Sequence, residues 1–333
     1  MIYNTVAYPR AGLIGNPSDG YFGKTISFCF TNFQASVMLW ESPELIIQPM
    51  ACDLSEYASL QALAEDVQSF GYYGGIRLLK AAIKRFYKYC IENNITLQKK
   101  QFTIRYETNI PHHVGLAGSS AIITASMRAL LEFYNVTIDK PILANLILSV
   151  ENEELGIPAG LQDRVAQVYG GVTYMDFNKD MMLARGYGEY KEIDPKLLPN
   201  LYIAYRTDLS EGSEVFHSDI RHRYNKGDSE VIDAMLFWAN LTSQAYELLK
   251  SGNGKKIGPL LDSNFDKRAS LYKISEGNLW MVKTARKCGA SAKFSGSGGA
   301  IVGVYEDDAM FDKLSAALTE KNVVVIKPNI HGQ

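Results

Sequence analysis

A strand-like run passes into a helix-like run through a short loop of glycine and serine at residues 111–121. The loop reads Pro-His-His-Val-Gly-Leu-Ala-Gly-Ser-Ser-Ala, between the strand pattern of residues 102–106 and the helix pattern of residues 122–134. The first turn of a helix leaves about four N–H groups unpaired and carries about half a positive charge, which together favour a bound phosphate. Glycines let the backbone approach such an anion closely.

This pattern predicts a phosphate-binding loop, and an ordinary Gly-Ser helix cap is the alternative. In the first interpretation, a serine hydroxyl caps the helix or reaches a phosphate-bound Mg²⁺. The expected phosphate-binding residues are His113, Val114, Gly115, Leu116, Ala117, Gly118, Ser119 and Ser120.

Length and composition limit what the chain can do. Its 333 residues suggest about two domains, and 47% hydrophobic and 21% charged residues are typical of a globular protein. A net charge of −2 gives no indication of a nucleic-acid or membrane-surface partner. The longest apolar run, at residues 141–150, is too short to span a bilayer.

The cysteines and the first residues of the chain bear on its location. Cys29, Cys52, Cys90 and Cys288 show no C-x-x-C or other metal-binding spacing, so we expect buried thiols in a reducing compartment. The first residues lack the charged and apolar regions of a signal peptide. The sequence therefore predicts a cytoplasmic protein.

Strand and helix patterns alternate along the chain. The expected strands are residues 2–8, 25–30, 33–40, 44–48, 102–106, 172–175, 201–205, 292–294, 300–305 and 323–326. The expected helices are residues 59–70, 75–91, 122–134, 141–155, 228–249, 279–288 and 310–320. We expect residues 25–30, 33–40 and 44–48 to be successive antiparallel strands, and residues 178–180 to be a turn. The pattern predicts an α+β protein of two mixed halves divided near residue 190, whose cleft is a common place for ligands.

A glycine-rich segment at residues 9–19 follows the first expected strand. It places the cation of Arg10 and the carboxylate of Asp19 across a turn, and a surface turn with an ion pair would give the same pattern. Nearby, residues 23–25 end like a Walker A loop, but Ser18 stands where that loop requires its first glycine. The segment also continues as a strand, so we expect phosphates at residues 113–120 instead.

An acidic segment ends the helix expected at residues 141–155. Glu151, Glu153 and Glu154 precede a turn with two glycines and a proline, after which Asp163 stands beside Arg164. The turn redirects the chain, so Glu151 and Asp163 can face one cavity. Mg²⁺ prefers hard oxygen ligands, and a carboxylate near an arginine can accept a hydroxyl proton. A solvated helix end is the alternative.

Together with a third glycine-rich turn, these segments resemble the motifs of the GHMP kinases. Residues 111–121 match P-x-x-x-G-L-[AG]-G-S-S-A, residues 151–163 match E-x-E-x-x-G-x-P-x-G-x-x-D, and residues 293–300 match K-x-[ST]-G-x-G-G-x. In the motif at residues 9–19, Arg10, Gly15 and Asp19 match the cation, the glycine and the sugar-binding aspartate. Asn16-Pro17 replaces the Glu-His of galactokinases and Gly12 replaces their asparagine, which points to a different sugar.

The resemblance implies a two-domain fold and a set of roles. Residues 1–190 would form an N-terminal mixed α/β domain with a left-handed βαβ phosphate loop, and residues 191–333 a ferredoxin-like α+β domain. ATP and Mg²⁺ are implied, with Ser120 and Glu151 holding the metal, Asp163 acting as base and Arg10 stabilising charge during transfer. The implied substrate-binding residues are Asn16, Pro17, Ser18, Asp19, Tyr21, Arg164, Gly296 and Ser297.

Longer runs at residues 10–27, 71–79 and 155–171 are similar to the plant-type glucuronokinases. That similarity implies ATP-dependent phosphorylation of the anomeric hydroxyl of D-glucuronate, by a monomer or a homodimer. Other sugar 1-kinases, acting on galacturonate, a hexose or a heptose phosphate, are alternatives, as is a non-catalytic sugar sensor. A mevalonate kinase is disfavoured by residues 16–19 and 162–164.

A uronate substrate needs a cationic partner, because the guanidinium fork of arginine binds a carboxylate through two hydrogen bonds. The sequence does not rank the candidates, which are Arg164, Lys24, Arg206 and Arg268. Tyr72 or Tyr73 could stack on the adenine or pack at a helix entrance.

Overall fold

The chain forms two compact units, each assembled from separate segments. The computed structural model describes residues 1–50, 53, 59–61, 63, 74–209 and 213–330. Unit 1 contains residues 1–9, 33–112 and 117–168, and unit 2 contains residues 10–32, 113–116 and 169–333. The division near residue 190 into two sequence-continuous domains stays a prediction.

Unit 1 is built on one four-stranded sheet. Its strand order is β1 (Ile2–Ala7), β4 (Ala35–Ser42), β6 (Gln101–Thr108) and β5 (Ile46–Ile47). β1 and β6 are antiparallel to β4, whereas β5 is parallel to β6. In β4 the buried residues Ala35, Val37 and Leu39 alternate with more exposed ones, because successive side chains of a strand point to opposite faces.

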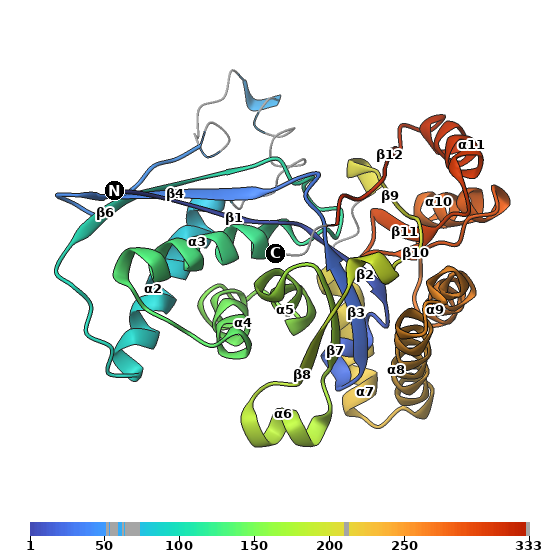
Figure 1. Ribbon diagram of the computed structural model, residues 1–333, viewed down its shortest axis with the longest axis horizontal. Helices are drawn as coiled ribbons and strands as arrows, with labels where there is room; N and C mark the ends of the chain where they lie inside the picture. Colours follow the sequence, from blue (N-terminus) through green and yellow to red (C-terminus); the bar gives the residue numbers. More distant parts are fainter. Residues whose placement is uncertain (51–52, 54–58, 62, 64–73, 210–212, 331–333) are drawn as a thin grey trace. The chain divides into compact units, whose positions relative to one another are not determined.

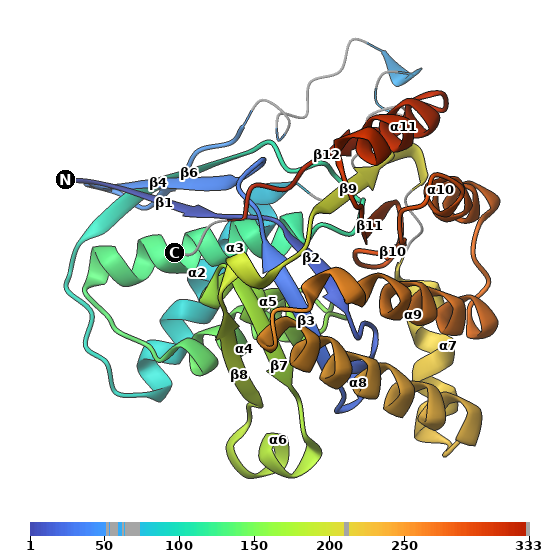
Figure 2. The same ribbon diagram turned by 45° about the vertical axis from the view of Figure 1, so that its right-hand side comes forward.

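Helices cover one face of this sheet (Figures 1 and 2). They are α2 (Gly75–Glu92), α3 (Gly118–Tyr134), α4 (Lys140–Ser149), a π-helical segment (Val150–Glu154) and α5 (Leu161–Tyr169). α3 packs against β1 and β4 and also against α2 and α4. It is therefore buried over most of its surface, including Ile123, Met127 and Leu130.

Unit 2 contains two antiparallel sheets. The first has the order β2 (Arg10–Ile14), β3 (Lys24–Cys29), β7 (Val172–Asp176) and β8 (Glu189–Ile193). The second has the order β10 (Lys293–Phe294), β11 (Ala300–Val304), β9 (Leu201–Tyr205) and β12 (Val324–Ile326). The second order, with a helical stretch after β9 and a helix after β11, is the ferredoxin-like arrangement that the resemblance implies.

Helices pack on both of these sheets. Those of unit 2 are α6 (Lys179–Arg185), α7 (Ser213–Asn225), α8 (Ser229–Lys250), α9 (Gly258–Leu271), α10 (Glu276–Lys287) and α11 (Asp308–Thr319), with 3-10 turns at Ser18–Tyr21 (η1), Pro195–Leu197, Thr207–Leu209 and Gly254–Ile257. α8 contacts β2 and β3, and α9 contacts β2. Buried Tyr202, Met281 and Leu314 join the second sheet to α10 and α11 in one apolar core.

Three expectations about individual elements are wrong. Residues 24–47 do not form successive antiparallel neighbours, because β3 pairs with β2 and β7 in unit 2, and β4 and β5 both pair with β6 in unit 1. The segment at residues 9–19 begins as strand β2, buried throughout, instead of a turn. At residues 178–180, Asn178 Oδ1 accepts from the N–H groups of Asp180 and Met181 and so begins helix α6.

The other expected strands and helices are present with small shifts at their ends, except residues 59–70, which lie mostly outside the described residues. Residues 23–25 lead into strand β3, as the rejection of a Walker A loop requires. The handedness of the implied βαβ unit stays a prediction. No helix among the described residues has the length and apolar character needed to cross a membrane.

Candidate active site

The predicted site residues are divided between the two units. In unit 1, helix α3 begins without a side-chain cap. Its N-cap, Ala117, has a left-handed backbone (φ 62°) and makes no side-chain hydrogen bond to the first turn. The N–H groups of that turn are therefore not capped by a side chain, as a phosphate-binding helix start requires.

The two serines of this turn have different partners. Ser119 Oγ donates to Glu151 Oε1 at 3.1 Å. Ser120 is fully buried, and its Oγ donates to the carbonyl of Ala117 at 3.1 Å. The hydroxyl that lies beside the predicted metal ligand Glu151 is thus that of Ser119.

Arg164 joins the two carboxylates that the sequence assigns to metal binding and proton transfer. Its guanidinium is paired with Glu151 Oε2 and lies 3.4 Å from Asp163 Oδ2. It also donates to the carbonyl of Gly160 at 2.9 Å. Glu151 and Arg164 are buried, whereas the side chain of Asp163 is 21% exposed. Arg164 therefore contacts one buried carboxylate and one that is partly exposed.

A folded-back turn creates this grouping. Glu151 lies in the π-helical segment, a type of irregularity that is frequent at functional sites. Asn152 Oδ1 then accepts from the N–H of Ala159 at 2.9 Å, which closes the turn before α5 begins at Leu161. The turn thus brings Asp163 and Glu151 to a common partner, Arg164. That the two carboxylates face one cavity stays a prediction.

Gln167 is a residue that the sequence motifs did not single out. It is 1% exposed, and its Nε2 donates to the carbonyls of Ala117 at 2.9 Å and Tyr8 at 3.2 Å. It thus ties α5, which carries Asp163, to the left-handed residue before α3. Its place four residues after Asp163, on the same face of a helix, is the signal that could have indicated it.

The oxygens around Glu151 fit a magnesium ion. Mg²⁺ takes hard oxygen ligands and is usually held by one or two carboxylates together with nucleotide phosphates. The Glu151 carboxylate and the Ser119 hydroxyl supply such oxygens next to the start of α3. Within the described ranges, no group of three or more His, Cys, Asp or Glu side chains is placed to hold a metal ion.

In unit 2, Arg10 joins the first half of the phosphate loop to the third motif. Its Nη1 donates to the carbonyls of Gly115 at 2.7 Å and Ser295 at 3.1 Å, and its side chain is buried. Its backbone N–H donates to Leu116, and Gly12 donates to Ser295. The structure therefore brings residues from all three glycine-rich segments together. The role of Arg10 in stabilising transferred charge stays a prediction.

Glycines are required where these segments touch. A Cβ on Gly296 would lie 2.3 Å from the carbonyl oxygen of Gly115, and a Cβ on Gly115 would lie 3.0 Å from the backbone nitrogen of Ser297. The φ of Gly115 is also +67°, which a side chain would strain. The two loops are therefore in backbone contact.

We predict that Gly296→Ala lowers the free energy of unfolding by about 2 kcal/mol, because the new methyl group overpacks the contact with Gly115. Urea unfolding of the variant measures this. Gly258→Ala is the control, since a Cβ there meets only ordinary contacts at 3.5 Å or more. Equal stability of the two variants would contradict the backbone contact.

Lys293 is a second residue without a predicted role, although it is the first residue of the third motif. It is 1% exposed, and its Nζ donates at 2.6 Å to the carbonyls of Gly12 and Phe294 and to Asn16 Oδ1. Burial, and then the charges of Arg268 and Arg10, lower the pKa of Lys293 well below its ordinary value. The hydrogen bonds to the three acceptors offset part of the free-energy cost of burying the lysine side chain.

The predicted substrate segment, Asn16 to Tyr21, divides into two parts. Asn16 is bound by Lys293 and Asn264, and the Ser18 hydroxyl exchanges hydrogen bonds with the backbone of Lys24. These hydrogen bonds hold the segment in place on both sides of Pro17. Asp19 and Tyr21 follow in η1, where Asp19 is partly exposed and Tyr21 is buried.

The four candidates for the uronate carboxylate all have partners. Arg164 is paired with Glu151, Lys24 with Asp176 at 3.2 Å, and Arg206 with Asp208 at 2.6 Å. Arg268 donates to the carbonyls of Gly296 and Ser297, and these two hydrogen bonds hold the backbone of the third motif. Tyr72 and Tyr73 lie outside the described residues.

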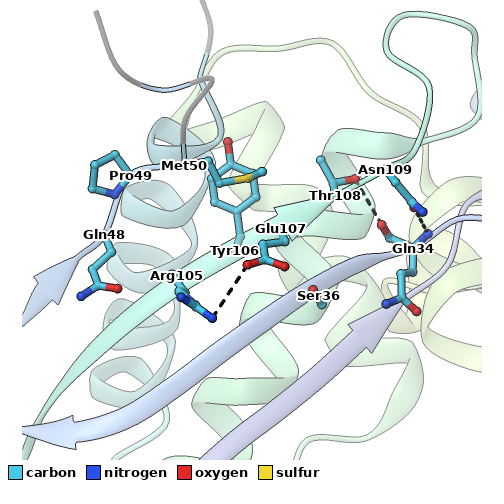
Figure 3. A pocket seen from close by; sticks show the side chains of 10 residues that line it. All are labelled: Gln34, Ser36, Gln48, Pro49, Met50, Arg105, Tyr106, Glu107, Thr108 and Asn109. Atoms are coloured by element: carbon cyan, nitrogen blue, oxygen red, sulfur yellow. Dashed lines mark hydrogen bonds and ion pairs between the residues drawn. The ribbon is translucent and has the colours of Figure 1, made fainter.

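Unit 1 also carries a pocket of about 450 Å³ on β4 and β6 (Figure 3). Gln34, Gln48, Met50, Arg105 and Glu107 are among its lining residues. Arg105 and Glu107 form an ion pair of 3.8 Å across it, drawn as a dashed line in Figure 3. It contains no residue that the sequence predicts for the site.

Two family models match the chain. The model of the GHMP kinases N terminal domain matches residues 77–171, and the GHMP kinases C terminal model matches residues 245–324. The first contains the phosphate loop and the acidic motif, and the second contains the third motif.

Two plant relatives are similar over most of the chain. Glucuronokinase 1 of Arabidopsis thaliana is 45% identical over 89% of this chain and 83% of that protein. Probable glucuronokinase 2 of the same plant is 43% identical over 98% of this chain and 91% of that protein. A D-glycero-alpha-D-manno-heptose 7-phosphate kinase of Campylobacter jejuni is 26% identical over 81% of each chain.

Solved structures share the fold. The mevalonate kinase of Methanococcus jannaschii has a TM-score of 0.73 at 19% identity, over 99% of this chain and 98% of that one. The Lactococcus lactis galactokinase complexed with galactose has a TM-score of 0.76 at 16% identity, over 99% and 94%. At these identities the similarity concerns the fold alone.

Proposed function

The chain belongs to the GHMP kinase family, and from this premise we propose that it transfers the γ-phosphoryl group of ATP to the anomeric hydroxyl of D-glucuronate. The products are glucuronate 1-phosphate and ADP. The substrate is inferred from the two plant relatives, since both are named glucuronokinases and align with most of the chain. Both the phosphorylated position and the roles of individual residues are part of the proposal.

One observation carries the chemical part of the proposal. A continuous chain of contacts runs from Ser119 at the start of α3 through Glu151 and Arg164 to Asp163. It links the helix N-terminus suited to phosphates with the partly exposed carboxylate suited to proton transfer. A fixed arrangement of this kind matches the demands of phosphoryl transfer, in which positioning and electrostatics supply most of the rate.

In the proposed reaction Asp163 accepts the proton of the anomeric hydroxyl. The oxygen then bonds to the γ-phosphorus, and the bond from that phosphorus to the β,γ-bridging oxygen breaks to release ADP. Glu151, with the hydroxyl of Ser119 or Ser120, would hold Mg²⁺, whose charge balances the phosphates. Arg164 keeps Asp163 and Glu151 in place.

The partners and the location of the protein are also part of the proposal. Glucuronate and ATP are the proposed small-molecule partners of a monomer or a homodimer in the cytoplasm. Cys29 and Cys90 are buried as expected, whereas Cys288 is partly exposed. Cys52 lies outside the described residues.

ADP release with Mg²⁺-ATP tests the substrate, using glucuronate, galacturonate, galactose, glucose and mevalonate in parallel. We expect kcat/KM for glucuronate to exceed every other value by at least about tenfold, and EDTA to abolish the reaction. Activity on another sugar alone would retain the family chemistry and refute the substrate. No ADP release with any of the five would favour a sugar sensor.

A further inference from the structure

Unit 2 contains two buried tyrosine hydroxyls for which the described residues offer no hydrogen-bond partner. Tyr21 in η1 is 5% exposed and Tyr272, which follows α9, is 7% exposed. Neither hydroxyl has a hydrogen-bond partner within the part of the chain that the structure describes. A buried hydroxyl that stays unpaired costs free energy, so such a group in a native protein usually serves a water or a ligand.

Arg221 of helix α7 lies against the first of these tyrosines. Its guanidinium carbon is 4.4 Å from the centre of the Tyr21 ring, and its Nη1 donates to the carbonyl of Gly20 at 2.8 Å. The Arg221 side chain is exposed and, among the described residues, forms no ion pair with a carboxylate. Its neighbour Arg223 differs, since it is paired with both Asp228 and Glu230 at 2.8 Å.

The same charged groups act on both tyrosines. Burial raises the pKa of the Tyr21 and Tyr272 hydroxyls. For each tyrosine, the charge of Arg221 lowers the pKa and the charge of Asp19 raises it. The two hydroxyls therefore belong to one cluster with Asp19, the aspartate that matches the sugar-binding position of the family motif.

Arg268 connects this cluster to the third motif. Its guanidinium carbon lies 5.2 Å from the centre of the Tyr272 ring, while its two outer nitrogens donate to Gly296 and Ser297. These hydrogen bonds occupy Arg268 as a structural support. Arg221 uses Nη1 for the carbonyl of Gly20, so among the described residues its Nε and Nη2 remain available to a ligand.

We propose that Arg221, together with the hydroxyls of Tyr21 and Tyr272, binds the carboxylate of the uronate substrate. The guanidinium matches a carboxylate in charge and shape, and each hydroxyl can donate to a carboxylate oxygen. Asp19 then accepts a hydrogen bond from a sugar hydroxyl, because it would repel a second carboxylate. This carboxylate site rests on the proposed function. The family resemblance already implies Tyr21 in substrate binding, whereas Arg221 and Tyr272 lie outside its motifs.

The test compares glucuronate with its neutral amide, glucuronamide, in the wild type and in Arg221→Met. We expect the variant to lower kcat/KM for glucuronate about 10- to 100-fold and to change that for glucuronamide less than about threefold. Arg223→Met is the matched control on the same helix, and it should leave the ratio of the two substrates unchanged. Equal losses on both substrates would overturn the inference.

Tyr272→Phe supplies a second and independent readout. Removing a buried hydroxyl without a protein partner should leave the unfolding temperature unchanged or raise it, while KM for glucuronate increases several-fold. An unchanged KM would contradict the assignment of this hydroxyl to the substrate. If the wild type phosphorylates no uronate, the proposed function itself is refuted. If the wild type is active on glucuronate and Arg221→Met is unaffected, only the carboxylate site is refuted.

Discussion

Asp163→Asn is expected to lower kcat by at least about 10²- to 10⁴-fold, because the amide cannot accept the proton of the attacking hydroxyl. Asparagine keeps the shape of the side chain. Its amide oxygen can still accept from Arg164, whose Nη1 lies 3.4 Å from Asp163 Oδ2 in the wild type. The ATP affinity should therefore stay nearly unchanged. Single-turnover kinetics with glucuronate, and a separate titration with ATP, measure the two quantities.

Glu92→Gln is the control for this variant. Glu92 is a half-exposed carboxylate of unit 1 that lies 3.4 Å from Arg85, so it forms the same kind of ion pair with a residue that has no proposed role in the chemistry. Its loss should leave kcat within about twofold of the wild type. Turnover of Asp163→Asn near the wild-type rate would refute the assignment of Asp163 as the base.

Lys293→Met is expected to cost about 1–3 kcal/mol of unfolding free energy. The variant leaves the buried acceptors of Gly12, Asn16 and Phe294 without their common donor. Chemical denaturation measures the loss. Lys191→Met, in which an exposed lysine loses its pairing with Glu189, should show no measurable change.

The contribution of Lys293 also depends on pH. Because its pKa is lower in the folded protein than its ordinary value of 10.5, the unfolded chain binds this proton more tightly. The free energy of unfolding of the wild type, relative to Lys293→Met, should therefore rise with pH through the interval below 10.5. A difference between the two proteins that falls with increasing pH would contradict this.

Local sequence patterns predicted the elements whose burial follows a simple period. α2 and α8 have an apolar face at helical spacing, and β9 and β11 are apolar runs of strand length. β2 was missed because Arg10 to Ile14 are buried on both faces and include a glycine, so the alternation of a half-exposed strand is absent.

Strand pairing was harder to predict than strand position. The short link between β3 and β4 suggested a hairpin, but β3 pairs with β7, nearly 150 residues further along, at Thr25 and Met175. Which strands pair depends on how their side chains pack against the rest of the fold, and a local sequence pattern carries no information about that packing.

The motifs located the residues of the candidate site, but not their hydrogen-bond partners. Glu151 and Asp163 were singled out for chemistry, whereas Arg164 was one of four unranked candidates for the substrate carboxylate, and its contacts with both of them were not predicted. Lys293 binds Asn16 over 277 positions of sequence, and no spacing rule reaches that far. Arg221 lay in no motif, and its proximity to Tyr21 becomes visible only in the folded unit.

The most direct test of the central claim locates the phosphate that the protein adds to glucuronate labelled with ¹³C at carbon 1. Phosphorus and carbon NMR of the product, recorded as ADP accumulates, should show coupling between the new phosphorus and the labelled anomeric carbon, with one phosphate ester per ADP. A phosphate on any other carbon, or ADP formed without a sugar phosphate, would contradict the proposed reaction.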